Sequence, residues 1–152
     1  MMQETLEKLR AFPARLAAAA AGLSDADASR LEREGGWSVA DVVAHLGDLE
    51  LVYAVRIRTI VAGAGEGPLT PLAQNAWVER VHRREPLTEL LESFRFHRAY
   101  NLAFLERLSE EELGRSGIHP EYGPITPRMA AERLVNHDAK HLAQLERIKG
   151  TL

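Results

Sequence analysis

Four segments of this chain repeat apolar residues at the spacing of an α-helix, and this pattern limits the fold more than any other feature. The segments cover residues 3–22, 39–61, 86–108 and 127–149. No segment shows the strict apolar–polar alternation of a β-strand. Amphipathic helices of this length bury their apolar faces against one another. The sequence therefore predicts an all-α protein, and a four-helix bundle is its expected architecture.

Several residues mark where these helices begin. Ser38 followed by Asp41 is the pattern of a capped helix start, and Thr126 followed by Pro127 is another. Pro13 lies inside the first segment, where a proline either kinks the helix or starts a second one. The caps at residues 38 and 126 set where two helices begin, and these two helices carry the histidines that are candidate metal ligands.

The connections between the main segments are expected to hold short additional helices and two loops. Ser24 caps one short turn of helix, and residues 72–84 form a second short helix. Residues 62–71 and 114–126 are rich in glycine and proline, which predicts loops. A chain of this length with these elements is expected to be a single domain over residues 1–152.

Charge and residue content exclude several classes of protein. The net charge is −3 and the arginines alternate with acidic residues, so no basic stripe for nucleic acid is present in the sequence. The chain has no cysteine, which rules out disulfides, thiolate nucleophiles and cysteine ligands for zinc. No stretch reaches the roughly 18 to 20 apolar residues of a membrane span. We therefore expect a cytoplasmic protein without nucleic-acid or membrane partners.

Two histidines lie four residues apart on the apolar face of the last segment. His137 and His141 share that face with Leu134 and Leu145. Side chains at this spacing stand about 5 to 6 Å apart at Cβ, and two imidazoles can then bind one ion with bonds of about 2.0 to 2.1 Å. Two core histidines that each form their own hydrogen bonds would give the same pattern. The spacing alone is compatible with both interpretations.

The remaining histidines differ in how well they could complete such a site. His45 is the best third ligand, because it lies on the apolar face of segment 39–61, about two turns from its start. His97 is either a fourth or supporting contact or a residue at the edge of the core. His82 is expected to be solvated, and His119 could fold over one end of the bundle.

Four charged residues could support a site built on these histidines. Asp48 lies one turn beyond His45, and Asp138 is next to a histidine of the last segment, so either carboxylate could accept the free N–H of a ligand imidazole. The alternative is a solvated carboxylate, which we expect for Asp138. Arg56 and Arg98 lie on or beside inward faces, where a guanidinium could bind an anionic substrate group. Surface arginines with buried stems are the alternative.

The segment 114–126 is longer than most connections between helices need to be. It carries His119, Glu121 and Tyr122, three side chains that can donate or accept protons. We expect the segment either to lie near the open side of a bound metal and to shape a substrate pocket, or to be a turn-rich linker with a solvated His119.

A short helix outside the four main ones raises the question of oligomeric state. Trp77 and Val81 add apolar surface there, and the pairing of two chains would bury it. We expect a homodimer; the alternative is that the short helix covers the end of its own bundle.

Two stretches of the sequence resemble a known family. They are GGWSVADVVAHLGDLE, residues 35–50, and HPEYGPITPRMAAERLVNHDAKHLAQLERI, residues 119–148. Their order and spacing resemble the DinB/YfiT-like superfamily of metal-dependent bacterial proteins over nearly the whole chain. The resemblance implies an up-down-down-up four-helix bundle. It also implies one divalent ion, zinc or nickel, held by His45, His137 and His141.

The resemblance also suggests what such an ion would do. Some relatives are transferases or isomerases that use a low-molecular-weight thiol, and this chain could use one only as a cofactor because it has no cysteine. Three protein ligands leave an open position on the ion, as in catalytic zinc sites. We therefore expect a metal-dependent enzyme, a thiol-dependent transferase or a hydrolase, acting on a small molecule. The alternative is a metal-binding bundle without catalysis, in which the ion joins two helices and adds folding energy.

Overall fold

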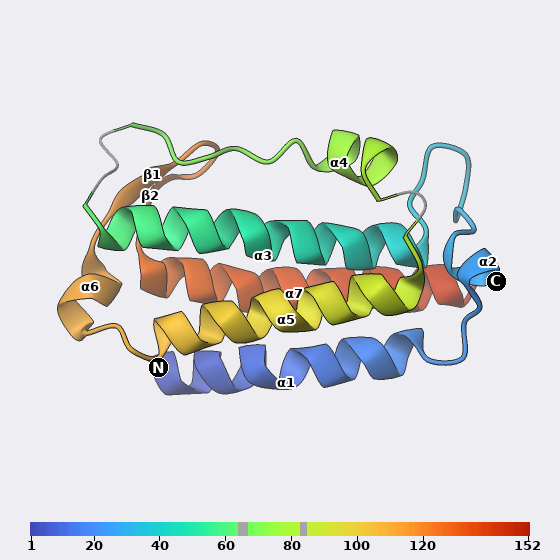
Figure 1. Cartoon of the computed structure of the whole chain (residues 1–152), viewed down its shortest axis with the longest axis horizontal. Helices are drawn as coiled ribbons and strands as arrows, with labels where there is room; N and C mark the ends of the chain where they lie inside the picture. The colour runs from blue at the N-terminus through green and yellow to red at the C-terminus, as the bar shows by residue number, and fades with distance from the viewer. Residues whose placement is uncertain (64–66, 83–84) are drawn as a thin grey trace.

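The structure, a computed structural model, describes residues 1–63, 67–82 and 85–152, and four long helices lie side by side in it (Figure 1). The helices are α1 (Met2–Ala20), α3 (Val39–Val61), α5 (Leu87–Leu105) and α7 (Pro127–Lys149). Each lies where the apolar period predicts a helix, so the prediction of an all-α four-helix bundle is confirmed. None of the helices in these ranges combines the length and the apolar character that crossing a membrane would need.

The helices follow an up-down-down-up order. The colour gradient in Figure 1 shows that α1 and α7 run in one direction along the bundle and that α3 and α5 run in the other. α3 packs against α5 and α7, and α1 packs against the same two helices, so α1 and α3 lie across the bundle from each other. Because the consecutive helices α3 and α5 are parallel neighbours, the chain between them must travel the length of the bundle. Residues 67–82 of this connection lie along α3.

The predicted caps form where the sequence places them. The hydroxyl of Ser38 accepts a hydrogen bond from the amide of Asp41 at 3.1 Å, and the Asp41 carboxylate accepts one from the amide of Ser38 at 2.8 Å. These bonds fix where α3 begins and so how far along it His45 lies. Thr126 caps α7 through its hydroxyl in the same way. α1 continues through Pro13, so a second helix does not start there.

Short helices lie in the connections, as expected. They are α2 (Asp25–Ala28), α4 (Gln74–Arg80) and α6 (Glu110–Gly114). α4 is shorter than the helix predicted over residues 72–84, and the end of that prediction falls in part outside the described residues. The same is true of part of the loop predicted over residues 62–71.

A small β-hairpin occupies the segment that the sequence predicts to be a loop. β1 (Gly117–His119) pairs with β2 (Gly123–Ile125) in antiparallel register, with Gly117 opposite Ile125. The prediction of a simple loop was wrong because strands of three residues are too short to show alternation, and Pro124 masks the second one. The hairpin holds its turn in a fixed position beside α3 and α7.

A layer of buried charge divides the core into two apolar clusters. One cluster includes Leu16, Leu46 and Leu145, and the other includes Leu9 and Leu134. Along each long helix, the residues of the two clusters form two separate groups, and the charged layer lies between them.

Arg98 of α5 is the centre of that layer and is 1% exposed. Its guanidinium donates to Glu50 of α3 at 2.9 Å, to both carboxylate oxygens of Asp138 of α7 at 2.8 and 2.9 Å, and to the carbonyl of Leu9 of α1 at 3.1 Å. Asn101 donates to Glu50 at 2.8 Å. We call Arg98, Glu50, Asp138 and Asn101 the Arg98 network. It joins α3, α5 and α7 through side chains and reaches α1 through the carbonyl of Leu9.

The Arg98 network corrects two expectations. Asp138 is buried and paired, not solvated, and Arg98 is neither a surface residue nor free to bind a substrate. Burial acts to lower the pKa of Arg98, but the charges of Glu50 and Asp138 outweigh it and raise the pKa above its usual value. A single sequence cannot show this, because the partners come from three different helices.

Candidate metal centre

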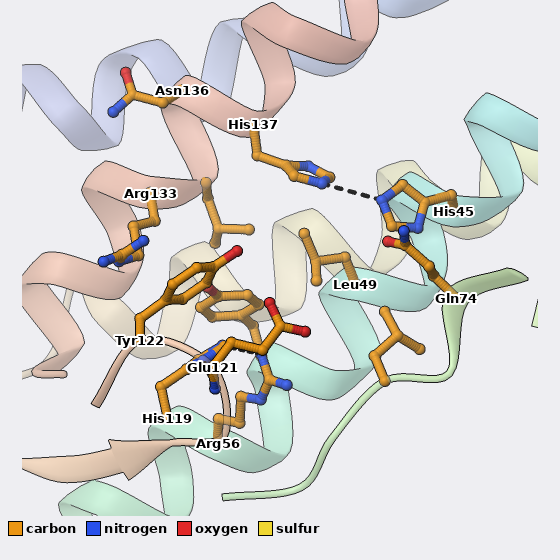
Figure 2. Close-up of a pocket in the computed structure, with 13 residues that line it drawn as sticks. His45, Leu49, Arg56, Gln74, His119, Glu121, Tyr122, Arg133, Asn136 and His137 are labelled. Carbon is orange, nitrogen blue, oxygen red and sulfur yellow. Dashed lines mark hydrogen bonds between the residues drawn. The ribbon is translucent and has the colours of Figure 1, made fainter. Parts of the chain in front are cut away.

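The three predicted histidines meet between α3 and α7. His45 comes from the second turn of α3, and His137 and His141 come from successive turns of α7. One ring nitrogen from each of the three lies within 4.8 Å of the other two. The Nε2 atoms of His45 and His137 are 3.0 Å apart, as the dashed line in Figure 2 marks. The antiparallel packing of α3 and α7 therefore brings together residues that are 92 positions apart in the chain.

The hydrogen bonds around the rings indicate which nitrogens face the centre. Nδ1 of His141 lies 2.7 Å from the side-chain oxygen of Gln144, so this nitrogen carries the proton and Nε2 keeps its lone pair. Nδ1 of His45 and of His137 is buried without a hydrogen-bond partner in the part of the chain that the structure describes. Separate core hydrogen bonds therefore do not explain the three rings.

Burial keeps these rings uncharged at neutral pH. It lowers the pKa of His45 to about 3 and that of His137 to about 2, and the positive potentials of His141 and Lys140 act in the same direction. The pKa of His141 is also lowered, again chiefly by burial. Neutral imidazoles are the form that binds metal. Three such nitrogens on one spot suit a divalent ion such as zinc or nickel.

A cavity of about 230 Å³ opens beside two of the histidines (Figure 2). His45 and His137 form one part of its wall, and the hairpin residues His119, Glu121 and Tyr122 form another. The segment 114–126 was expected either to shape a pocket beside the histidines or to be a linker with a solvated His119. The structure favours the first alternative, because His119, Glu121 and Tyr122 line this cavity and His119 is buried. Of these, Glu121 is the carboxylate of the cavity wall.

Two arginines line the same cavity. Arg56 is 5% exposed; its Nε donates to the carbonyl of Thr70 at 2.8 Å, and its Nη1 lies 2.9 Å from Nε2 of His119. Arg133 of α7 lies over the ring of Tyr122, with 4.2 Å from the guanidinium carbon to the ring centroid. Arg56 was a candidate from the sequence, whereas Arg133 was not. Its position one helical turn before His137 on the same helix could have indicated it.

A second cavity, of about 680 Å³, reaches the third histidine. His141 lines it together with Trp37, whose ring is stacked on the His141 ring at 6.1 Å. Arg33 and Lys140 give this cavity a basic wall, whereas Arg147 pairs there with Glu32. Gln74 of α4 lines both cavities. The three-histidine group thus lies between two openings.

The other candidates are placed away from the centre. His82 was expected to be solvated, but it is largely buried and contacts the carboxylate of Asp48 at 2.7 Å, with Glu85 on its other nitrogen at 3.1 Å. Asp48 therefore does not support His45. His97 lies half-buried on α5, near the hydroxyl of Ser93, and lines neither cavity.

Comparison with known proteins assigns the family. The model of the DinB superfamily matches residues 8–145. The chain belongs to the DinB superfamily. A relative from Oceanobacillus iheyensis, named as a candidate metal-dependent hydrolase, is 28% identical over 95% of this chain and 83% of its own length.

Two solved structures resemble the fold of this chain. YfiT from Bacillus subtilis, described as a probable metal-dependent hydrolase with an unusual four-helix bundle topology, is 25% identical, with a TM-score of 0.86 over 97% of this chain and 85% of that one. A mycothiol-dependent maleylpyruvate isomerase has a TM-score of 0.80 over 95% of this chain and 60% of that one. At 13% identity, the isomerase shows a shared fold and nothing about the reaction.

Proposed function

We propose that this DinB superfamily protein is a metal-dependent hydrolase in which His45, His137 and His141 hold one divalent ion, zinc or nickel. The observation that carries the proposal is the convergence of three neutral imidazoles, two of which line a polar cavity. Three protein ligands leave a position open to that cavity. The names of the relatives support the same assignment.

Each group of the cavity then has a distinct task. A divalent ion held by His45, His137 and His141 would supply Lewis-acid chemistry, which activates water and polarises a substrate carbonyl. Glu121 accepts the proton that the attacking group loses, because it is the carboxylate exposed to the cavity. Leu49 and Leu134 contribute apolar wall, which positions the uncharged part of a small substrate.

Metal analysis of purified variants tests the ligand set. His45→Ala, His137→Ala and His141→Ala should each lose most of the bound ion, measured by mass spectrometry after dialysis against trace zinc or nickel. His97→Ala is the matched control, because His97 is half-buried in the bundle but lies outside both cavities. Full retention of the ion in one of the first three variants would remove that histidine from the set.

A kinetic test distinguishes a hydrolase from a protein that binds metal without catalysis. With a panel of small esters, amides and lactones, Glu121→Gln should lower turnover by roughly 100-fold or more while the bound metal stays unchanged. If the loaded wild-type protein turns over none of the panel and Glu121→Gln behaves identically, the non-catalytic metal bundle is the better description.

A thiol-dependent transferase is the second candidate, and the second cavity favours it. His141 lines that cavity, so a thiol cofactor could approach the ion from the side opposite the substrate. Its basic residues Arg33 and Lys140 would suit a thiol that carries carboxylates. Thermal-shift measurements on the loaded protein with low-molecular-weight thiols, compared with Lys140→Gln, test this candidate.

We further propose a single cytoplasmic domain over residues 1–152 that acts as a homodimer on a small molecule, without nucleic-acid partners. Val81 at the end of α4 is 60% exposed, while Val78 of the same helix is buried against its own bundle. The exposed side of α4 supports pairing. A monomer mass by light scattering at micromolar concentration would contradict the dimer.

A further inference from the structure

His119 faces two hydrogen-bond donors, one at each ring nitrogen. Its Nδ1 lies 3.1 Å from the backbone N–H of Glu121, and its Nε2 lies 2.9 Å from Nη1 of Arg56. A neutral imidazole has one lone pair available to accept and one N–H, and a protonated imidazole has no acceptor. The ring therefore cannot accept from both neighbours.

The backbone contact decides where the ring proton lies. The amide of Glu121 lies in the turn between β1 and β2, and its N–H points at Nδ1 of His119. Nδ1 is then the acceptor, and Nε2 carries the proton. Two donors, the Nε2–H of His119 and an N–H of Arg56, consequently meet at 2.9 Å inside the cavity. A single acceptor placed beside both donors would satisfy them together.

The charges around this pair indicate what the acceptor is. In the described part of the chain, no carboxylate oxygen comes within 4 Å of the guanidinium of Arg56 or Arg133. Arg56, Arg133 and Glu121 are the charged residues that line the cavity, so two positive charges face one negative charge and a single positive charge remains. In the metal-free protein, one excess charge matches a monoanion better than the dianionic form of a phosphate.

We infer that Arg56 and His119 bind the carboxylate of a small monoanionic substrate, with Arg133 attracting the same group from across the cavity. This inference rests on the proposed function, since the same cavity is bordered by His45 and His137. A planar carboxylate can accept from two donors on one side, as it does in arginine–carboxylate pairs. The cavity volume of about 230 Å³ limits the substrate to a small acid.

Anion binding to the full chain tests this subsite separately from the metal. Propionate is titrated into the metal-free and the zinc-loaded protein and followed by nuclear magnetic resonance; propionamide is the neutral isostere and inorganic phosphate the dianion. Propionate should bind the metal-free protein at millimolar concentrations, at least tenfold more tightly than propionamide or phosphate. Arg56→Gln and His119→Phe should each weaken propionate by roughly 10- to 100-fold, the range expected for one charge-assisted hydrogen bond.

Matched variants keep the test decisive. Arg133→Gln should weaken propionate several-fold, whereas Arg128→Gln, on the same helix but paired with Glu110 outside the cavity, should leave it unchanged. If Arg56→Gln does not fold, Arg56→Lys and His119→Phe take its place. Equal binding of propionate and propionamide, or propionate binding unaffected by His119→Phe, overturns the inference. Zinc binding measured on the same samples tests the metal centre independently: zinc without propionate binding overturns the subsite alone, and propionate without zinc overturns the metal centre alone.

Discussion

Replacing Arg98 by methionine should destabilise the protein far more than replacing any surface arginine. Methionine keeps a similar length and an apolar stem but donates no hydrogen bond. The change leaves Asp138 and the carbonyl of Leu9 without the guanidinium that they share in the native protein, and it leaves Glu50 with Asn101 as its side-chain partner. Two carboxylates then remain in the core without a compensating cation.

The size of the expected stability loss follows from the deep burial of the charged residues involved. Arg98, Glu50 and Asp138 are each at most 3% exposed, so water cannot replace the lost partner. Removing one partner of a buried ion pair costs about 3 to 5 kcal/mol. A domain of this kind has a total free energy of unfolding of about 5 to 15 kcal/mol. Arg98→Met should therefore remove about a fifth or more of the stability at pH 8.

Denaturation with guanidinium chloride, followed by circular dichroism, measures the effect. For a slope of about 4 kcal/mol per molar, a loss of about 4 kcal/mol lowers the midpoint by roughly 1 M. Burial, against the opposing effect of Arg98, already raises the pKa of Asp138 to about 6. Without Arg98 this carboxyl takes up a proton more readily in the folded state than in the unfolded chain, so the loss should shrink as the pH falls from 8 to 5.

Two comparisons decide whether the reasoning is right. Arg95→Met, one turn earlier on the exposed side of α5, should change the free energy of unfolding by less than about 0.5 kcal/mol. The double variant Arg98→Met with Asp138→Asn should recover part of the loss, because it removes one buried charge. An Arg98→Met protein within about 1 kcal/mol of wild type, or a loss that grows in acid, would refute the assignment of uncompensated buried charge.

Four further results are expected. Because burial lowers the pKa of His45 to about 3, the unfolded chain binds the proton first as the pH falls, so the metal-free protein should lose stability below about pH 6.5, by roughly 2 kcal/mol at pH 5 from this residue, in urea titrations. Zinc or nickel at 1,000 times its dissociation constant should add about 4 kcal/mol, seen as a higher melting temperature that a chelator reverses. Thr126→Ala should cost about 1 kcal/mol through loss of the α7 cap, measured by denaturation. Gly117→Ala should cost about 1 to 3 kcal/mol in the same assay, since its Cβ would lie 2.7 Å from Cγ1 of buried Ile60.

The helices and the histidine group could be predicted because their signals are local. The apolar period, the caps at Ser38 and Thr126, and the spacing of His137 and His141 all lie within single segments. The prediction for His45 needed one assumption about packing, which is that the apolar face of its helix contacts that of the last helix. In the structure the three histidines lie together.

The remainder depends on contacts between distant segments. Arg98 finds Glu50, Asp138 and Leu9 on three other helices, and no pattern within α5 distinguishes it from a surface arginine. The position of Arg56 beside His119 likewise requires the hairpin, whose strands are too short to show a period. His82 was misjudged for the same reason, because its partner Asp48 comes from α3.

The Arg98 network also determines how far α7 can slide along the bundle. Apolar contacts are non-directional and tolerate a small axial shift, whereas a guanidinium bound to both oxygens of one carboxylate does not. Each residue of a helix advances about 1.5 Å along the axis and turns by about 100°. Asp138 and His137 are neighbours in α7, so the alignment that seats one against Arg98 also sets the height and orientation of the other against His45. The alignment of the three imidazoles is thus set by a contact deep in the bundle, and substitutions in that contact will misalign them without touching the cavity.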